Sequence, residues 1–208
     1  VRATFAGTRY RARRLPLPER VVLALWHKLR LPLPIELMTG AVDLVHSPDF
    51  VLPPARCDRA VVTVHDLTYV THPETAHPAQ KRYLDRVVPR SVERATRVIA
   101  VSAATRDDLV SEYGVAPEKI DVIHNGLDAN FAVRPTGPQR RDARARFGLP
   151  ERFVLAVGTI QPRKNLVRTA QAVAAARARG HDIHFVQVGA AGWLSEGVLG
   201  GLEEVGDG

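Results

Sequence analysis

The residues with the clearest chemical character lie in one segment, GTIQPRKN at 158–165. It follows an apolar run typical of a buried strand and precedes a helical pattern that Asn165 can cap. Free N–H groups at the start of a helix attract anions, yet Arg163 and Lys164 place two cations there. A diphosphate bound at this turn would account for both cations. The alternative is a surface turn with two solvated basic residues.

A second candidate, His65-Asp66, also follows an apolar run. In parallel α/β sheets, ligands bind at the carboxyl ends of strands, where this pair would lie. His65 can exchange a proton or a hydrogen bond near neutral pH, and Asp66 could orient it or cap the next turn. Both residues could instead only satisfy loop backbone groups. The eight histidines lack the spacing of metal ligands, so we predict no metal site.

The elements that must position these residues alternate between apolar runs and helical patterns. We predict strands at 41–46, 60–65, 97–101, 119–124, 153–157 and 183–188. We predict helices at 78–95, 103–113, 140–147 and 165–179. Ser102 is a good N-cap for the second of these helices, and Gly114 is a good residue to end it. The alternation predicts an α/β fold with mostly parallel sheets covered by helices.

The chain is expected to form two domains. Residues 129–138 lose the alternation and gather proline and glycine, so we predict a linker there. The first domain would then span residues 1–128 and the second residues 139–208. Two strands are too few to bury a sheet, so the second domain is expected to be incomplete and the chain to be a fragment.

Composition narrows the class of protein. Hydrophobic residues make up 45% and charged residues 25%, which is typical of a globular protein. The single cysteine, Cys57, excludes a disulfide framework and fits a reducing, cytoplasmic compartment. No apolar run is long enough to span a membrane.

The net charge of +7 is concentrated in two segments. Residues 1–30 hold eight Lys and Arg against one acid, and residues 134–146 hold five Arg against one acid. Such clusters attract anions, although they also fit a solvated arginine-rich surface. Residues 19–31 could form a helix that packs on its own sheet or lies on a membrane surface. No aromatic or recognition-helix motif accompanies the arginines, so we predict no nucleic-acid binding.

Five segments together carry a resemblance to a known family: HDLTYVTHPE, RATRVIAVSAATRDDL, GVAPEKIDVIHNGLD, VGTIQPRKNL and VGAAGWL. In this order and spacing the sequence resembles glycosyltransferase family 4, and within it the bacterial mannosyltransferase-type branch. The resemblance implies the GT-B architecture, in which two Rossmann-like domains face each other across a cleft. The N-terminal domain would hold the acceptor and the C-terminal domain the nucleotide-sugar.

The resemblance also implies roles for individual residues. Arg163 and Lys164 would bind the donor diphosphate, and Gly158 would let the backbone approach the donor. Thr159 stands where many relatives have an arginine, so that phosphate contact would be either missing or supplied by Arg163. His65, with Asp66 beside it, would lie near the transferred sugar and hold one of its hydroxyls.

Other matching residues are expected to be structural. Asn125, Gly126 and Asp128 match a turn near the hinge between the domains, and Ser102 matches a serine that precedes a helix. Two family features are not found. Glu196, Glu203 and Glu204 are not in the context of the family's paired glutamates, which are expected later in the second domain. The glycine-rich loop that follows the first strand of the first domain is also absent, since Gly7 stands alone, so this domain too is expected to be incomplete and to lack its first strand.

The expected activity is transfer of a hexose, with mannose favoured, from a nucleotide-sugar to a glycan or lipid-linked acceptor with retention. GDP-mannose is the favoured donor, and no metal or other cofactor is expected. The fragment alone is expected to be inactive, in the cytoplasm or at the inner face of the membrane through residues 1–30. The alternatives are another GT-B enzyme, such as a nucleotide-sugar epimerase, and a non-catalytic nucleotide-binding or membrane-surface module.

Overall fold

The computed structural model describes residues 18, 21–22, 25–26, 31 and 33–206. The basic segment 1–30, the helix expected at 19–31 and Gly7 lie largely or wholly outside these residues and stay predictions. Within the described part of the chain, no helix is both long and apolar enough to cross a membrane.

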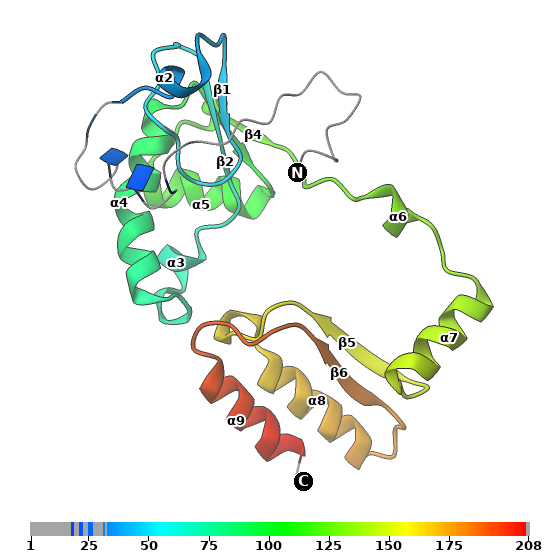
Figure 1. The fold of residues 1–208 in the computed structure, drawn as a ribbon. Coiled ribbons are helices and arrows are strands. Elements are labelled where there is room, and N and C mark those ends of the chain that lie inside the picture. Colours follow the sequence, from blue (N-terminus) through cyan, green and yellow to red (C-terminus); the bar gives the residue numbers. More distant parts are fainter. Residues whose placement is uncertain (1–17, 19–20, 23–24, 27–30, 32, 207–208) are drawn as a thin grey trace. The chain divides into compact units, whose positions relative to one another are not determined.

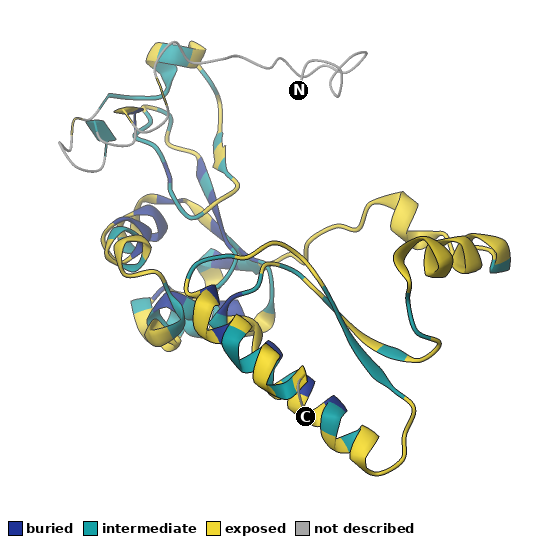
Figure 2. Ribbon diagram, turned by 60° about the horizontal axis from the view of Figure 1, so that its bottom comes forward, coloured by how far each residue is buried: buried dark blue, intermediate teal, exposed yellow. Residues whose placement is uncertain are grey.

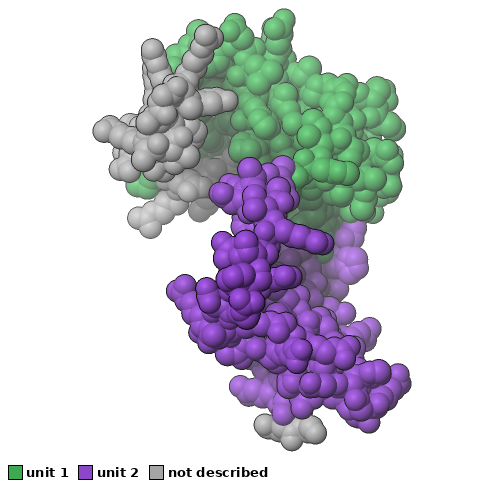
Figure 3. All heavy atoms as spheres, turned by 90° about the vertical axis from the view of Figure 1, so that its right-hand side faces the viewer, with its two compact units in different colours: residues 1–70, 82–125 green, residues 71–81, 126–208 purple. Residues whose placement is uncertain are grey.

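The chain divides into two compact units, which Figure 3 shows in green and purple. Unit 1 contains residues 1–70 and 82–125, and unit 2 contains residues 71–81 and 126–208. The expected domain limits, 1–128 and 139–208, remain predictions. The short segment 71–81 belongs to unit 2, although no local pattern predicted that it is separate from its neighbours.

Unit 1 is built on a parallel sheet whose strands lie in the order β1-β2-β3-β4 (Figure 1). The strands are β1 (Val45–Ser47), β2 (Ala60–Val64), β3 (Arg97–Ala100) and β4 (Ile120–Val122). Their register pairs Val45 with Ala60, Val61 with Arg97, and Val98 with Ile120. All four lie within the predicted segments or one residue beyond them. The first is shorter than expected, because only residues 45–47 pair with β2.

The helices of unit 1 supply the apolar side chains that bury this sheet. They are α2 (Glu36–Thr39), α3 (Thr68–Thr71), α4 (Pro78–Arg94) and α5 (Ala103–Tyr113), with the 3-10 turn η3 (Pro117–Lys119). The last residue of α3, the 3-10 turn η2 (Pro73–Thr75) and the first residues of α4 lie in the segment 71–81 of unit 2. The two longest, α4 and α5, bury residues such as Val88 and Leu109. Those side chains and Val62 of β2 have no exposed surface, so they belong to the apolar core of the unit.

Unit 2 contains a two-stranded parallel sheet of β5 (Phe153–Val157) and β6 (His184–Val188). Its helices are α6 (Ala129–Ala132), α7 (Gly137–Phe147), α8 (Leu166–Ala178) and α9 (Ser195–Gly206), with the 3-10 turn η4 (Pro162–Lys164). Helix α8 packs against β6 and α9. The strands, α7 and α8 match the prediction to within three residues, whereas α9 was not predicted.

The segment predicted as the linker, residues 129–138, contains regular structure. Residues 129–132 form α6, because the Asp128 carboxylate accepts a hydrogen bond from the Asn130 N–H at 2.8 Å. Helix α7 begins at Gly137 instead of residue 140, because Thr136 and Gln139 form a reciprocal capping box. Only residues 133–136 connect the two helices without regular structure.

Candidate functional site

The turn after β5 is shaped by its pairing with the turn after β6. The N–H of Gly158 donates to the carbonyl of Val188 at 2.8 Å, and the N–H of Ile160 donates to Ala190 at 2.9 Å. In the other direction, Gly192 donates to the carbonyl of Ile160 at 3.0 Å. The two turns therefore continue the parallel pairing past the ends of the strands, which holds the backbone of the expected diphosphate turn in a defined path.

Gly189 is required where these two turns meet. A Cβ atom at this position would lie 1.9 Å from the carbonyl oxygen of Gly158, and Gly189 has a φ of 155°. The same carbonyl accepts a hydrogen bond from the Gln187 side-chain amide at 2.8 Å. The close approach of the chains at Gly158 therefore depends on the missing side chain at Gly189.

The Lys164 side chain folds back over Gly158. A Cβ atom on Gly158 would lie 3.5 Å from Lys164 Cε and 3.8 Å from its Nζ, and Gly158 has a φ of 139°. The turn η4 that carries Lys164 is closed by the Lys164 N–H, which donates to Gln161 at 3.1 Å. An ammonium group thus lies at the carboxyl end of a parallel strand, as predicted for Lys164.

Both cations of this turn are available to a ligand. Arg163 and Lys164 are exposed, and within the described part of the chain neither side chain has an ion pair or a hydrogen bond. Thr159 is also exposed, with its methyl group directed at Gly192. Exposed cations that have no ion pair among the described residues can bind an anion with little loss of existing contacts.

The predicted side-chain cap by Asn165 is wrong. Asn165 precedes α8, but it lies in the left-handed region with a φ of 51° and its side chain accepts no capping hydrogen bond. This conformation arises because Asn165 also ends η4, donating its N–H to Pro162 at 3.0 Å. The start of α8 is left without a side-chain cap, which keeps its N–H groups open to an anion.

His65 follows β2 in unit 1 and is held at two points. Its Nε2 lies 2.9 Å from the carbonyl oxygen of Pro48, and its own carbonyl accepts a hydrogen bond from the Thr105 hydroxyl at 3.0 Å. The ring of Phe50 meets the imidazole edge to face, with 5.7 Å between the ring centroids. Pro48 and Phe50 were not identified from the sequence, since neither contact has a local sequence signature.

Asp66 caps the following turn and does not orient His65. Its Oδ1 accepts hydrogen bonds from the Thr68 N–H at 3.0 Å and from the Thr68 hydroxyl. No hydrogen bond joins Asp66 to His65 among the residues that the structure describes. Of the two uses considered for Asp66, the geometry therefore shows the cap.

Ser102 is the N-cap of α5, as expected. Its hydroxyl accepts from the Thr105 N–H at 3.1 Å and lies 2.9 Å from the Thr105 hydroxyl. Because Thr105 in turn donates to the carbonyl of His65, the cap and the candidate histidine are connected through one buried side chain. The spacing of Ser102 and Thr105 is typical of an N-cap, so the contact between these two residues can be predicted from the sequence. The contact between Thr105 and His65 cannot be predicted in this way.

The residues expected near the hinge are exposed. Asn125 is the last residue of unit 1, Gly126 begins the longer segment of unit 2, and Asp128 caps α6. A structural use is therefore seen for Asp128, whereas the hinge function of all three stays a prediction.

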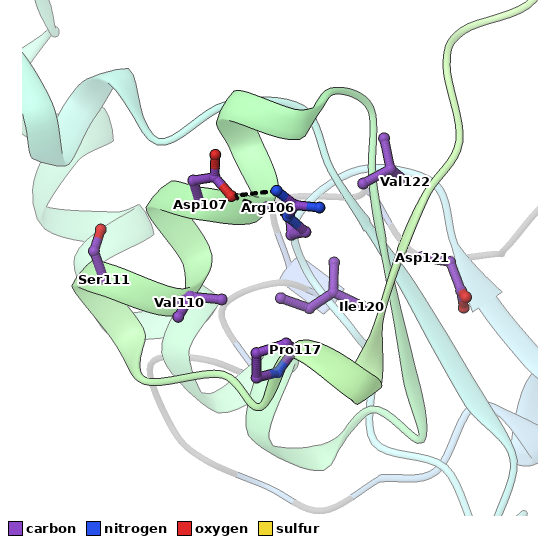
Figure 4. A pocket seen from close by; sticks show the side chains of 8 residues that line it. All are labelled: Arg106, Asp107, Val110, Ser111, Pro117, Ile120, Asp121 and Val122. Atoms are coloured by element: carbon purple, nitrogen blue, oxygen red, sulfur yellow. Dashed lines mark hydrogen bonds and ion pairs between the residues drawn. The ribbon is translucent and has the colours of Figure 1, made fainter.

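Two hollows lie away from the predicted site residues. One, of about 630 Å³, lies in unit 1 between α5 and β4. In Figure 4 the apolar side chains of Val110, Pro117 and Ile120 line it, beside the Arg106–Asp107 ion pair. The other, of about 330 Å³, lies between α8, β6 and α9 in unit 2. Among the described residues, no group of three or more His, Cys, Asp or Glu side chains could hold a metal ion.

Comparison with known proteins places the chain in a family. The sequence model of Glycosyltransferase Family 4 matches residues 2–131, which is more than half of the chain. The chain therefore belongs to glycosyltransferase family 4, as its motifs predicted. The match covers the candidate histidine and the connection to unit 2 and ends before the GTIQPRKN turn.

Curated relatives are longer than this chain. O-antigen chain mannosyltransferase B of Escherichia coli is 28% identical over 125 residues, which cover 59% of this chain and 32% of that protein. D-inositol 3-phosphate glycosyltransferase of Kineococcus radiotolerans is 34% identical over 134 residues, 59% of this chain and 30% of that protein. The matched segments thus span about a third of the length of these relatives.

A solved structure shares the fold. Anabaena Alr3699/HepE, crystallised in complex with UDP-glucose, aligns with a TM-score of 0.50 at 21% identity, over 71% of this chain and 38% of that chain. With the parallel sheets seen here, this supports the predicted fold class, the α/β architecture of GT-B glycosyltransferases.

Proposed function

We propose that this chain is part of a retaining glycosyltransferase that moves a hexose from a nucleotide-sugar to a glycan or lipid-linked acceptor. One observation carries the proposal: the Lys164 ammonium lies over Gly158 at the carboxyl end of β5, beside the exposed Arg163. Fixed cations at this edge of a parallel sheet suit a nucleotide diphosphate better than a neutral ligand.

In the proposed reaction, the bond between the anomeric carbon and the diphosphate oxygen breaks while a bond to the acceptor hydroxyl oxygen forms on the same face. The departing phosphate oxygen takes the hydroxyl proton. Lys164 and Arg163 stabilise the negative charge that develops on the diphosphate, which is the main contribution of the protein. These cations do this without a metal ion or another cofactor.

The geometry at His65 favours this path over double displacement. A double displacement needs a carboxylate that faces the anomeric carbon as nucleophile. Asp66, the carboxylate next to His65, is committed to Thr68 through two hydrogen bonds. We therefore assign Asp66 to the support of the loop and His65 to a hydroxyl of the sugar.

Mannose is the proposed sugar and GDP-mannose the favoured donor. The support for mannose is the resemblance of the motifs and the likeness to a relative named as a mannosyltransferase. The structural neighbour crystallised with UDP-glucose supports a nucleotide-sugar as the class of donor. UDP-glucose is therefore the comparison donor in the test.

Isothermal titration of the protein with GDP-mannose, UDP-glucose, GDP and UDP tests the proposal. Lys164→Ala is expected to weaken donor binding about 10-fold or more, because a charge-assisted hydrogen bond to phosphate contributes about 1.5–3 kcal/mol. The matched control is Arg168→Ala, which removes an exposed cation one turn further along on α8.

Equal weakening by Lys164→Ala and Arg168→Ala would show that only net charge matters and would reject the site. Failure of every nucleotide and nucleotide-sugar to bind would reject the function. Tighter binding of UDP-glucose than of GDP-mannose would reject the proposed donor and leave the diphosphate site in place.

A further inference from the structure

The loop that joins β1 to the following segment is anchored beside His65. The Ser47 hydroxyl donates to the carbonyl of Val51 at 2.6 Å, and the N–H of Phe50 donates to the carbonyl of Thr63 on β2 at 3.0 Å. Between these anchors, Phe50 has a φ of 49°, a conformation that non-glycine residues rarely adopt. Such backbone strain persists only where surrounding contacts hold it.

The contacts of the Phe50 ring show what the strained backbone achieves. The ring meets His65 at 5.7 Å and Tyr69 at 6.3 Å between centroids, edge to face in both cases. Tyr69 is buried and its hydroxyl lies 3.0 Å from that of Tyr113. Phe50 is thus wedged between a fixed tyrosine and the imidazole, and it limits rotation of the His65 ring.

The carbonyl of Pro48 decides which nitrogen of His65 carries the proton. A carbonyl oxygen only accepts hydrogen bonds, so the contact of 2.9 Å requires a proton on Nε2. In the neutral imidazole the other nitrogen, Nδ1, then has a free lone pair and can only accept. Among the described residues, Nδ1 has no hydrogen-bond partner.

We infer that the loop 48–50 is a positioning device that fixes His65 as the Nε2–H tautomer and leaves Nδ1 as the only nitrogen open to a ligand. Neutral His65 then recognises a hydrogen-bond donor, such as a hydroxyl group, and rejects a group that can only accept. Phe50 is a positioning residue in this arrangement. The identity of the ligand as a sugar rests on the proposed function, whereas the tautomer does not.

Nitrogen-15 NMR of the histidine-labelled protein tests the tautomer directly. The spectra are recorded at about pH 9, which is well above the ordinary pKa of about 6.5 for a free histidine side chain. His65→Gln identifies the His65 signals. The expected result is a pyrrole-type shift at Nε2 and a pyridine-type shift at Nδ1, in contrast to averaged shifts at the exposed His124. A proton on Nδ1, or averaged shifts at His65, would overturn the inference.

Phe50→Gly tests the positioning role. Glycine adopts a φ of 49° without strain, so the backbone path is kept while the ring is lost. The His65 shifts are expected to move toward the averaged values. The matched control is Phe131→Ala, which removes a ring that is 79% exposed and should leave the His65 shifts unchanged. A folded Phe50→Gly protein with unchanged His65 shifts would remove Phe50 from the device.

The NMR measurement and the donor titration can fail independently of each other. A nucleotide-sugar that binds is expected to shift Nδ1 of His65 and leave Nε2 unchanged, whereas a shift of Nε2 alone would contradict the assigned contact. If no nucleotide-sugar binds and the tautomer is as expected, the proposed function fails and the positioning device stands. If the Phe50→Gly protein does not fold, the tautomer in the unmodified protein still decides.

Discussion

The two candidate sites are held in different ways. His65 in unit 1 is tied to Pro48 through its ring and to Thr105 through its carbonyl, and Phe50 packs against it. Lys164 in unit 2 has no side-chain hydrogen bond or ion pair within the described part of the chain, and its position follows from the backbone at Gly158. The side chain of His65 is thus held by contacts with other residues of the chain, whereas Lys164 presents a charge without a partner among the described residues.

This difference has a physical reason. A neutral group that must accept one hydrogen bond in a defined direction needs its ring fixed in advance, because the bond is short-ranged and directional. A cation that meets a diphosphate acts through a field that tolerates more movement. Rigid support at His65 and freedom at Lys164 are therefore each suited to the proposed partner.

The strands that precede the two sites, β2 and β5, also differ in how far their residues are buried. In β2, four of five residues are buried, whereas β5 has none (Figure 2). Leu155 and Val157 of β5 are 52% and 69% exposed. The sheet of unit 2 thus depends more on its strand pairing and turn geometry than on a closed core, and the following predictions probe that contrast.

The largest effect is expected at Gly189. Gly189→Ala should destabilise unit 2 by about 3 kcal/mol, because the new Cβ would overlap the carbonyl of Gly158 and the φ of 155° is strained for alanine. Hydrogen–deuterium exchange by mass spectrometry should show lost protection in residues 153–194 of unit 2 and little change in residues 60–70 and 82–100 of unit 1.

The matched control is Gly197→Ala on α9, where a new Cβ meets nothing within 4 Å. This change should be neutral or stabilise by up to about 1 kcal/mol, because alanine favours a helix. Equal protection losses in both glycine variants would contradict the view that the meeting of the two turns is the fragile point of unit 2.

A smaller effect is expected at Ser102. Ser102→Ala should lower the free energy of unfolding of unit 1 by about 1 kcal/mol, the usual cost of losing an N-cap. Urea unfolding measures this change. Ser111→Ala removes an exposed hydroxyl of the same helix and should change stability little. If Ser102→Ala and Ser111→Ala change the free energy of unfolding equally, the N-cap at Ser102 does not contribute to the stability of the unit that holds His65.

The smallest effect is expected from the pair that joins β3 to β4. Arg97 hydrogen-bonds both carboxylate oxygens of Asp121, and this contact lowers the pKa of Asp121. The stabilisation is therefore present above the unfolded pKa of about 3.9 and is lost as the pH falls through the lower folded value. Because the pair is exposed, the contribution is small.

Thermal melts of Asp121→Asn between pH 7 and pH 2 measure this loss. The variant should melt slightly lower at pH 7 and converge with the unmodified protein in acid. Asp107→Asn makes the same charge change on α5 without touching β3 or β4. A constant difference between Asp121→Asn and the unmodified protein at every pH would contradict the role of the ionised pair.

Local sequence patterns identified much of the fold. The apolar run 153–157 and the run 60–65 contain strands because valine and other β-branched or aromatic residues favour the extended backbone of a paired strand. Ser102 and Gly114 set the ends of α5 because capping depends on neighbours in sequence. The turn 158–165 was identified because two cations at the start of a helix are unfavourable, and this pattern is visible in a short segment of the sequence.

Other features depended on residues far apart in the chain. The Phe50 ring contacts His65 because the backbone N–H of Phe50, in the loop after β1, is hydrogen-bonded to the carbonyl of Thr63 on β2. Asn165 was predicted as a side-chain cap, and the competing turn η4 placed it in the left-handed region instead. The requirement for glycine at position 189 likewise arises from Gly158, which lies far from it in the sequence.

By itself, the sequence determined the family, the α/β alternation and the two segments that carry chemical groups, because motifs, hydrophobic periodicity and caps act over short distances. Only the tertiary structure decided that Asp66 serves its own turn, that Pro48 fixes the proton of His65 and that Lys164 covers Gly158. These are directional contacts between separate elements, and their geometry exists only once the strands are paired and the turns closed.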